Sequence, residues 1–205
     1  MIQFKNHIWL PMLLLIAHVM HSEVLLAQAI LHKTSSLTNA SFEGDPQDAT
    51  VPVGWFPCVA RTTPDILPGF WGVYNEASEG ETYIGLITRN NGTWEAIGQR
   101  FSVPLQPKNC YIFSIDLAHS KTYAGYNKPL KLRIWGGAER CGQHQLIAET
   151  DLVKHRDWET YRFKVFPEKA INYILLEAFY KEGSFQRNGN ILIDNISTFT
   201  LCPRV

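Results

Sequence analysis

The sequence predicts an all-β protein, an antiparallel β-sandwich of the jelly-roll type with about ten strands. Short segments rich in β-branched and aromatic residues recur along the chain, and Gly, Pro, Asn and Asp separate them. Hydrophobic and polar residues alternate with a period of two in several of these segments, which is the pattern of a half-buried strand. Little of the sequence after the first 29 residues has the pattern of a helix.

The strand segments follow one another at the spacing of a sandwich. Alternation is clearest in 110–119, where Phe113 and Ile115 fall on one face and Ser114 and Asp116 on the other. The motifs NNG, PKN, GG and RNGN supply turns between segments. In chain order, the segments that we expect to form strands are 37–42, 54–58, 70–75, 81–88, 95–103, 110–119, 130–136, 145–150, 158–166, 172–181 and 190–200.

The first 29 residues have the features of a secretory signal peptide. Lys5 supplies a positive charge, a short apolar run follows at 8–19, and AQA at 27–29 is a small-x-small cleavage site. An uncleaved N-terminal anchor is the alternative, although the apolar run is short for a membrane span. We therefore expect a signal peptide (1–29), a short leader (30–36) and one jelly-roll domain (37–202).

The charge balance argues against a nucleic-acid partner. The chain has 19 Lys and Arg against 19 Asp and Glu. Removing the signal peptide takes away Lys5 and Glu23, so the exported chain stays formally neutral. A strong basic footprint is therefore missing from the composition. We also expect no transmembrane segment in the exported chain.

Four cysteines follow the signal peptide, and an even number in an exported protein predicts two disulfides. They are isolated rather than arranged in CxxC pairs, which argues against a zinc site. Three connectivities are possible. We expect Cys110–Cys202, because both residues flank long predicted strands, and this leaves Cys58–Cys141. Each bridge would stabilise the fold by about 3–4 kcal/mol on the chain-entropy model.

Asp194 stands inside the hydrophobic run ILIDNI of the last predicted strand. Burying a carboxylate costs several kcal/mol unless its charge is compensated. Glu43 ends the first predicted strand, and the first and last strands of a closed sandwich commonly lie side by side. The two carboxylates would then repel each other unless they share a proton or a cation. Calcium, which takes hard oxygen ligands, is a suitable cation.

Five short motifs follow one another along the chain. They are Asn39–Glu43 (N-x-SFE), Gly54-Trp55, Gln99–Phe101, Tyr111–Ser114 and Ile191–Ile196. Together they resemble the secreted carbohydrate-binding modules of families 4, 9 and 22, within the galactose-binding-like jelly rolls, and jelly-roll domains of exported Bacteroidetes proteins. The resemblance spans nearly all of the chain after the signal peptide.

The resemblance implies a structural calcium ion held by Glu43 and Asp194. The carbonyl of Ser41 is the expected third ligand. Such modules often add an acid from a later loop, here EASEGET, and we choose Glu79 from its three glutamates. The alternative is that Asp194 only accepts backbone N–H bonds at a β-bulge.

Exposed aromatic rings are the expected contacts for a sugar, because the apolar face of a sugar stacks on them. Trp135 alternates with Leu132 and Ile134, so it should point away from the core. Trp55 and Trp158 are more typical of the core or a sheet edge. The candidate ligand-binding residues are Trp71, Tyr74, Trp94, Tyr123, Tyr126 and Trp135.

No catalytic arrangement stands out. The sequence has no G-x-S-x-G nucleophile motif and no H-E-x-x-H metal motif. We therefore expect a secreted or periplasmic, non-catalytic domain that binds a glycan or a cell-surface polymer. The alternative is a cell-envelope domain that binds another envelope protein or has a structural role. A hydrolase using paired acids such as Glu76 and Glu79 is a third reading.

Overall fold

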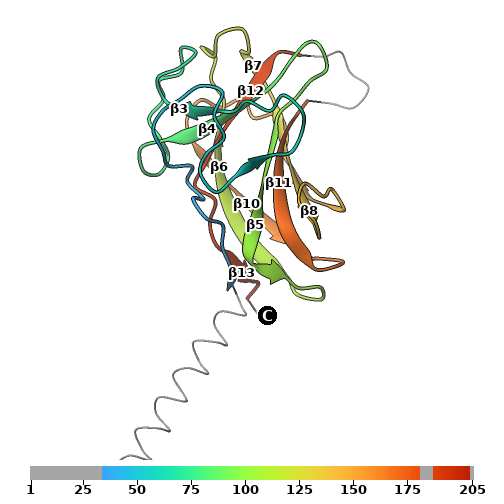
Figure 1. The fold of residues 1–205 in the computed structure, drawn as a ribbon. Helices are drawn as coiled ribbons and strands as arrows, with labels where there is room; N and C mark the ends of the chain where they lie inside the picture. The colour runs from blue at the N-terminus through green and yellow to red at the C-terminus, as the bar shows by residue number, and fades with distance from the viewer. Residues whose placement is uncertain (1–33, 181–186, 204–205) are drawn as a thin grey trace, which may run out of the picture.

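The chain folds into two β-sheets packed face to face (Figure 1). The structure, a computed structural model, describes residues 34–180 and 187–203. These residues form thirteen strands and no helix, so the predicted all-β sandwich is confirmed. Accordingly, the described part of the chain contains no helix with the length and hydrophobicity needed to cross a membrane. The expected signal peptide lies outside the described residues.

The larger sheet has eight strands, with a path β1-β13-β6-β12-β4-β3. Strand β10 pairs with β6 along its whole length, and the short β7 pairs in parallel with β12. The strands of the larger sheet are β1 (Thr34–Ser35), β3 (Asp65–Leu67), β4 (Tyr83–Thr88), β6 (Tyr111–Ala118), β7 (Lys128–Pro129), β10 (Glu159–Val165), β12 (Gly189–Asp194) and β13 (Phe199–Leu201).

The smaller sheet has five strands in the order β2-β5-β11-β8-β9, all antiparallel. The central β11 pairs with β5 on one side and with β8 on the other. Its strands are β2 (Phe56–Pro57), β5 (Ala96–Leu105), β8 (Lys131–Gly137), β9 (Gln145–Glu149) and β11 (Ile171–Phe179).

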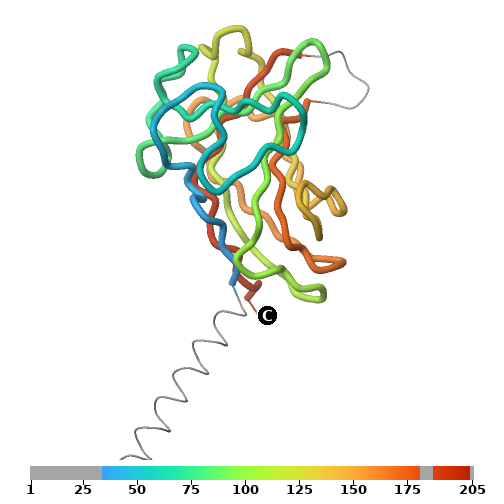
Figure 2. The backbone as a smooth tube through the Cα atoms, viewed as in Figure 1, coloured from blue at the N-terminus to red at the C-terminus, as the bar shows by residue number. Residues whose placement is uncertain are grey.

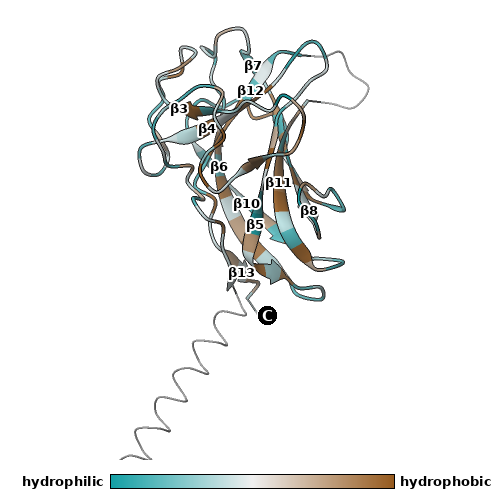
Figure 3. Cartoon of the chain, in the orientation of Figure 1, coloured by the Kyte–Doolittle hydropathy of each residue, from teal (hydrophilic) through white to brown (hydrophobic). Residues whose placement is uncertain are grey.

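The main hydrophobic core fills the space between the two sheets. It follows the predicted alternation, because Phe113, Ile115, Leu132 and Ile134 all point inward and are at most 4% exposed. Hydrophobic residues lie mainly on the strands and hydrophilic residues mainly in the loops (Figure 3). Burying each large apolar side chain contributes about 1.5–3 kcal/mol, so this core supplies most of the stabilisation.

A second, smaller core lies on the outer face of the eight-stranded sheet. The loop after β3 (68–82) and the loop after β6 (119–127) fold over this face. Val73 and Tyr123 from these loops pack on Leu192 of β12. The second core therefore fixes the two loops against the sheet, which matters for the candidate site below.

Two of the predicted strands are wrong. Residues 37–42 form a turn, because Asn39 takes a φ of 49° and Phe42 one of 57°. Residues 70–75 form a loop, in which Trp71 has a φ of 55°. The last predicted strand is broken at Asn195 (φ 48°), which separates β12 from β13. Such left-handed conformations end a strand.

Both expected disulfides are confirmed, with the expected connectivity. Cys110 and Cys202 have Cα atoms 5.3 Å apart and join the start of β6 to the segment after β13. Cys58 and Cys141, with Cα atoms 5.2 Å apart, join the segments that follow β2 and β8. Thr34 and Ser35, expected in the leader, pair with β13.

Candidate functional site

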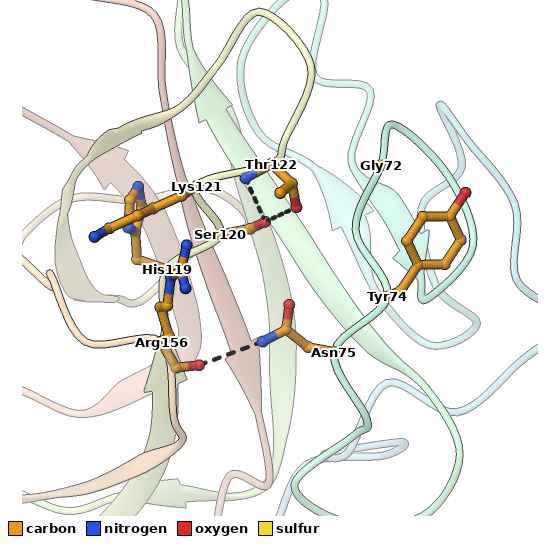
Figure 4. A pocket seen from close by; sticks show the side chains of 8 residues that line it. All are labelled: Gly72, Tyr74, Asn75, His119, Ser120, Lys121, Thr122 and Arg156. Atoms are coloured by element: carbon orange, nitrogen blue, oxygen red, sulfur yellow. Dashed lines mark hydrogen bonds between the residues drawn. The ribbon is translucent and has the colours of Figure 1, made fainter.

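Three loops meet beyond the C-terminal end of β6 and enclose a hollow of about 390 Å³ (Figure 4). They are the loop after β3, the loop after β6 and the segment between β9 and β10. The lining is polar, with one aromatic ring at its rim. The residues that line it are Gly72, Tyr74, Asn75, His119, Ser120, Lys121, Thr122 and Arg156.

Backbone hydrogen bonds hold these loops together. Ala124 N–H donates to the carbonyl of Trp71 at 2.8 Å. Gly72 has a φ of 78°, and a Cβ at this position would lie 2.8 Å from the carbonyl oxygen of Thr122. Only glycine therefore permits this close approach of the two loops. Asn75 donates from Nδ2 to the carbonyl of Arg156 at 3.3 Å, which links the third segment.

Tyr74 is one of the lining residues, and its exposed ring extends outward from the rim of this hollow, away from the other lining side chains (Figure 4). Its side chain is 74% exposed, and Trp71 in the same loop is 46% exposed. In Figure 4, Tyr74 lies on one side of Asn75, and Lys121 and Arg156 lie on the other. The hollow thus joins an apolar ring to groups that donate hydrogen bonds.

A second hollow, of about 490 Å³, adjoins the first. His119 and Lys121 line both. The remaining residues of its lining are Asn127, Lys128, Pro129, Lys154 and Arg187.

His119 is buried between the two loops, with only 2% of its surface exposed. Its Nε2 is 3.2 Å from the carbonyl oxygen of Asn127, which makes Nε2 the donor. The buried Nδ1 has no hydrogen-bond partner among the described residues. Burial lowers the pKa of His119 below its ordinary value of 6.5, and the charges of Lys121 and Arg156 lower it further. The neutral ring therefore offers an unused acceptor.

The outer face of the five-stranded sheet carries a second group of aromatic and charged side chains. Trp135 points away from the core, as predicted, and its Nε1 donates to Glu177 at 2.6 Å. The Arg133 guanidinium lies 3.3 Å from the centre of the Phe179 ring and bonds Glu149 at 2.7 Å. Burial raises the pKa of Glu177. Glu177 and Phe179 were not predicted, although they alternate with the inward residues of β11.

The other aromatic candidates are dispersed. Trp94 is 40% exposed in the turn before β5. Tyr126 is half-buried and packs edge-on against Tyr123, with ring centres 6.3 Å apart. The prediction for Tyr123 is wrong, because its ring is 1% exposed in the second core and its hydroxyl donates to Asp65. Burial raises the pKa of Asp65 despite this bond.

Asp194 is fully buried and accepts three backbone hydrogen bonds. Its Oδ2 accepts from Ser78 at 2.8 Å and from Glu79 at 3.0 Å, and its Oδ1 accepts from Asn195 at 2.7 Å. Burial raises the pKa of Asp194 to about 7, although the three hydrogen bonds act to lower it. The charge of Glu43 adds to the rise.

Glu43 and Asp194 do converge on one segment, residues 78–82. Glu43 accepts from the N–H of Glu81 at 3.1 Å. Asp116, which sequence reasoning missed, is the register partner of Asp194 on β6 and accepts from the Ser78 hydroxyl at 2.7 Å. The sequence places Asp116 on the polar face of its predicted strand, and this position could have identified it as a candidate site residue.

These carboxylates supply the hard oxygen atoms that calcium prefers. However, Glu79 is exposed, Ser41 is half-buried, and N–H donors already face Asp194. Within residues 34–180 and 187–203, no three His, Cys, Asp or Glu side chains are grouped in a way that could hold a metal ion. The hydrogen-bonded alternative for Asp194 therefore has direct support, and the calcium site stays a prediction.

No protein-family model and no curated protein sequence matches the chain. Among solved structures, a Stig cyclase, Fisc from Fischerella sp. TAU, is similar over 84% of this chain and 99% of its own, with a TM-score of 0.56 and 14% identity. The CBM22-1 xylan-binding domain of Paenibacillus barcinonensis Xyn10C is similar over 81% of this chain and 94% of its own, with a TM-score of 0.50 and 14% identity.

A third similar structure is the K3 cleaved adhesin domain of Lys-gingipain from Porphyromonas gingivalis w83. It covers 80% of this chain and 98% of its own, with a TM-score of 0.52 and 14% identity. These similarities confirm a jelly roll like that of carbohydrate-binding modules. Because a cyclase and a xylan-binding domain share the fold, the fold alone does not decide the function.

Proposed function

We propose that the chain is an exported, non-catalytic carbohydrate-binding domain, and that glycan binds in the hollow beside Tyr74. One observation carries the proposal. An aromatic ring that is 74% exposed stands at the rim of a hollow of about 390 Å³ with amide, hydroxyl and cationic groups on its lining.

The chemistry of a sugar matches this combination. One face of a pyranose ring presents C–H groups, which stack on an aromatic ring. Its rim presents hydroxyls, which exchange hydrogen bonds with groups such as Asn75 and Thr122. A few placed polar groups beside an apolar surface are typical of small-molecule sites of this size. Trp71 extends the apolar contact along the same loop.

The lining supports binding rather than hydrolysis. Glycoside hydrolysis uses two carboxyl groups on either side of the scissile bond. Among the described residues, none that lines the hollow is Asp or Glu. A glycan in this hollow would therefore lie without the pair of acids that cleavage requires.

The outer face around Trp135 is a second location for the same function. Trp135 and Phe179 offer ring surface there, with Arg133 and Glu177 beside them. The indole N–H of Trp135 already donates to Glu177. This pairing fixes the ring, so stacking would be its contribution to a ligand. We rank this face second because its rings are less exposed than Tyr74.

We also propose a structural calcium ion, held by the carboxylates of Glu43 and Asp194 with the carbonyl of Ser41 and with Glu79. The support is a buried carboxyl whose pKa is raised to about 7, partly by a second carboxylate. A cation there would offset the repulsion. Its role would be to stabilise the sandwich near the strand ends.

Export and the nature of the partner belong to the same proposal. Two disulfides suit an oxidising compartment, and the N-terminal sequence suits a signal peptide. The partner would be a glycan or a cell-surface polymer. The rival is a protein-interaction domain of the envelope, for which a flat apolar patch would be the expected surface.

A glycan array with the purified protein, in calcium and in chelator, tests the function. For a glycan that binds, Tyr74→Ala should weaken affinity by about tenfold, consistent with the loss of one stacking contact of roughly 1.5 kcal/mol. Phe166→Ala is the matched control, because Phe166 is 62% exposed and lies outside the hollow. Trp135→Ala reports on the second location. Binding by no glycan would favour the rival.

A further inference from the structure

The two adjoining hollows carry a local excess of positive charge. Within residues 34–180 and 187–203, none of those that line either hollow is Asp or Glu. The whole chain is formally neutral, with 19 basic and 19 acidic residues, so this excess is a local feature. The cations that line the hollows are Lys121, Lys128, Lys154, Arg156 and Arg187.

No carboxylate of the described residues pairs with any of these five cations. Elsewhere on the surface, by contrast, Lys131 and Arg133 both pair with Glu149, at 2.8 and 2.7 Å. Like charges around one concave surface raise the local positive potential and attract anions. The cluster therefore has the charge pattern of an anion site.

His119 provides a second and independent observation. It lines both hollows, and its buried Nδ1 lacks a donor among the described residues. Because Nε2 donates to Asn127, Nδ1 is an acceptor and suits a hydroxyl group. Buried polar atoms usually have a partner, so an orphaned one indicates a group still to be bound.

We infer that the paired hollows bind an acidic polysaccharide, with a sugar ring against Tyr74 and a carboxylate or sulfate group of the same polymer in the second hollow. Lys128, Lys154 and Arg187 would hold the anionic group. The inference rests on the proposed function and adds the class of glycan to it.

A polymer accounts for more of the site than a free anion does. Inorganic phosphate or sulfate would use the cations but would leave Tyr74 without a contact. A sugar acid presents an anionic group, hydroxyl donors and an apolar ring face on one molecule. The anionic group matches the cations, and the apolar ring face matches Tyr74.

The experiment measures affinity by isothermal titration calorimetry for matched pairs of polymers. Polygalacturonate is compared with its carboxyl-reduced form, and dextran sulfate with dextran. A preference within the first pair indicates that the site recognises a carboxylate, and a preference within the second indicates a sulfate. The wild type should bind the acidic member at least tenfold more tightly than its neutral partner.

Two double variants separate the proposed site from general surface charge. K128Q/K154Q should reduce affinity for the acidic polymer at least tenfold and leave the neutral polymer unchanged. R162Q/K164Q removes two charges from exposed positions on β10 and should bind as the wild type does. If K128Q/K154Q melts at a lower temperature, R187Q replaces it as the test variant.

Several outcomes would overturn the inference, and they differ from failure of the proposed function. Equal affinity for both members of each pair would refute the acidic-polysaccharide inference and leave the proposed glycan binding intact. Equal losses of affinity for the acidic polymer in both double variants would show that binding depends only on the overall surface charge. Inorganic phosphate that binds as tightly as the acidic polymer would indicate a free-anion site. If no polymer in either pair binds while the array shows another glycan that does, the inference fails and the proposed function stands; if the array also shows none, both fail.

Discussion

At the scale of single residues, the fold buries several acids that must be neutralised within the protein. Asp65, Glu95, Glu177 and Asp194 are at most 7% exposed, and burial raises the pKa of each. Their partners differ. Asp194 faces backbone N–H groups, whereas Glu95 faces the guanidinium of Arg89 at 2.7 Å. Two predictions follow from this difference in environment.

The first concerns calcium at Asp194. An ion bound only by the folded state adds about 2.7 kcal/mol at a hundredfold excess over its dissociation constant. Chelation should therefore lower the melting temperature of the wild type by roughly 5–10 °C. Asp194→Asn should melt identically in calcium and in chelator, measured by circular dichroism. If the wild type, once shown to be metal-free, has the same melting temperature in calcium and in chelator, the hydrogen-bonded alternative for Asp194 holds.

The second concerns the pH dependence contributed by Glu95. Its pKa is raised above 4.5 by burial, although Thr63 and Arg89 hydrogen-bond to it. The folded state then holds a proton that the unfolded state releases, so stability falls as pH rises through this window. Relative to Glu95→Gln, the wild type should gain stability as pH is lowered from 8 to 4.5. Urea unfolding of both proteins across this range checks the sign, and parallel curves would contradict it.

At the scale of elements, turns explain where the sequence was misread. Residues 37–42 have the composition of a strand, but Asn39 adopts a left-handed conformation. Its side chain accepts from Glu43 N–H at 2.7 Å and donates to the Glu43 carbonyl at 2.9 Å. A period-two pattern does not reveal such a local side-chain bond. Strand β6 was predicted well because hydrophobic alternation decides it, whereas β4 is an apolar run that is buried along its whole length.

Replacing Asn39 tests this turn. Asn39→Ala removes these two bonds and a third, from Nδ2 to the Val53 carbonyl at 3.2 Å, and leaves an alanine at a φ of 49°. We expect a loss of about 2–3 kcal/mol in the free energy of unfolding. Asn39→Gly should recover about 1 kcal/mol of it, because glycine tolerates a positive φ. Equal stability of the two variants in urea unfolding would show that the conformation contributes little.

At the scale of the whole molecule, long-range contacts hold the sandwich together. The sequence predicted the two layers and both disulfides. It did not predict the hollows, because their residues come from four separate parts of the chain that only the completed fold brings together. Lys121, Lys154 and Arg187 are widely separated along the chain and share no motif. The sequence therefore singled out exposed rings such as Tyr74 one at a time and could not group them with the residues around them.

Removing a disulfide tests this long-range stabilisation. Cys110 and Cys202 are separated by 92 residues, and a loop of this length gives about 4 kcal/mol on the chain-entropy model. The double variant Cys110→Ser, Cys202→Ser should lose an amount of this order in guanidinium unfolding. Cys202 N–H still donates to the Cys110 carbonyl at 2.8 Å, so the native pairing should survive. A loss below about 1 kcal/mol would contradict the model.

The pairing of β1 with β13 sets the direction in which the domain displays its hollows. Thr34 is the register partner of Thr200, so the first and last described strands lie side by side (Figure 2). They lie near the start of β6, whereas the hollows lie past its end, eight residues and roughly 25 Å away. A partner domain fused at either end would therefore sit at the opposite pole and leave the hollows facing outward. The same adjacency permits a circular permutant, in which a short linker joins the old ends and new ends open in an exposed turn.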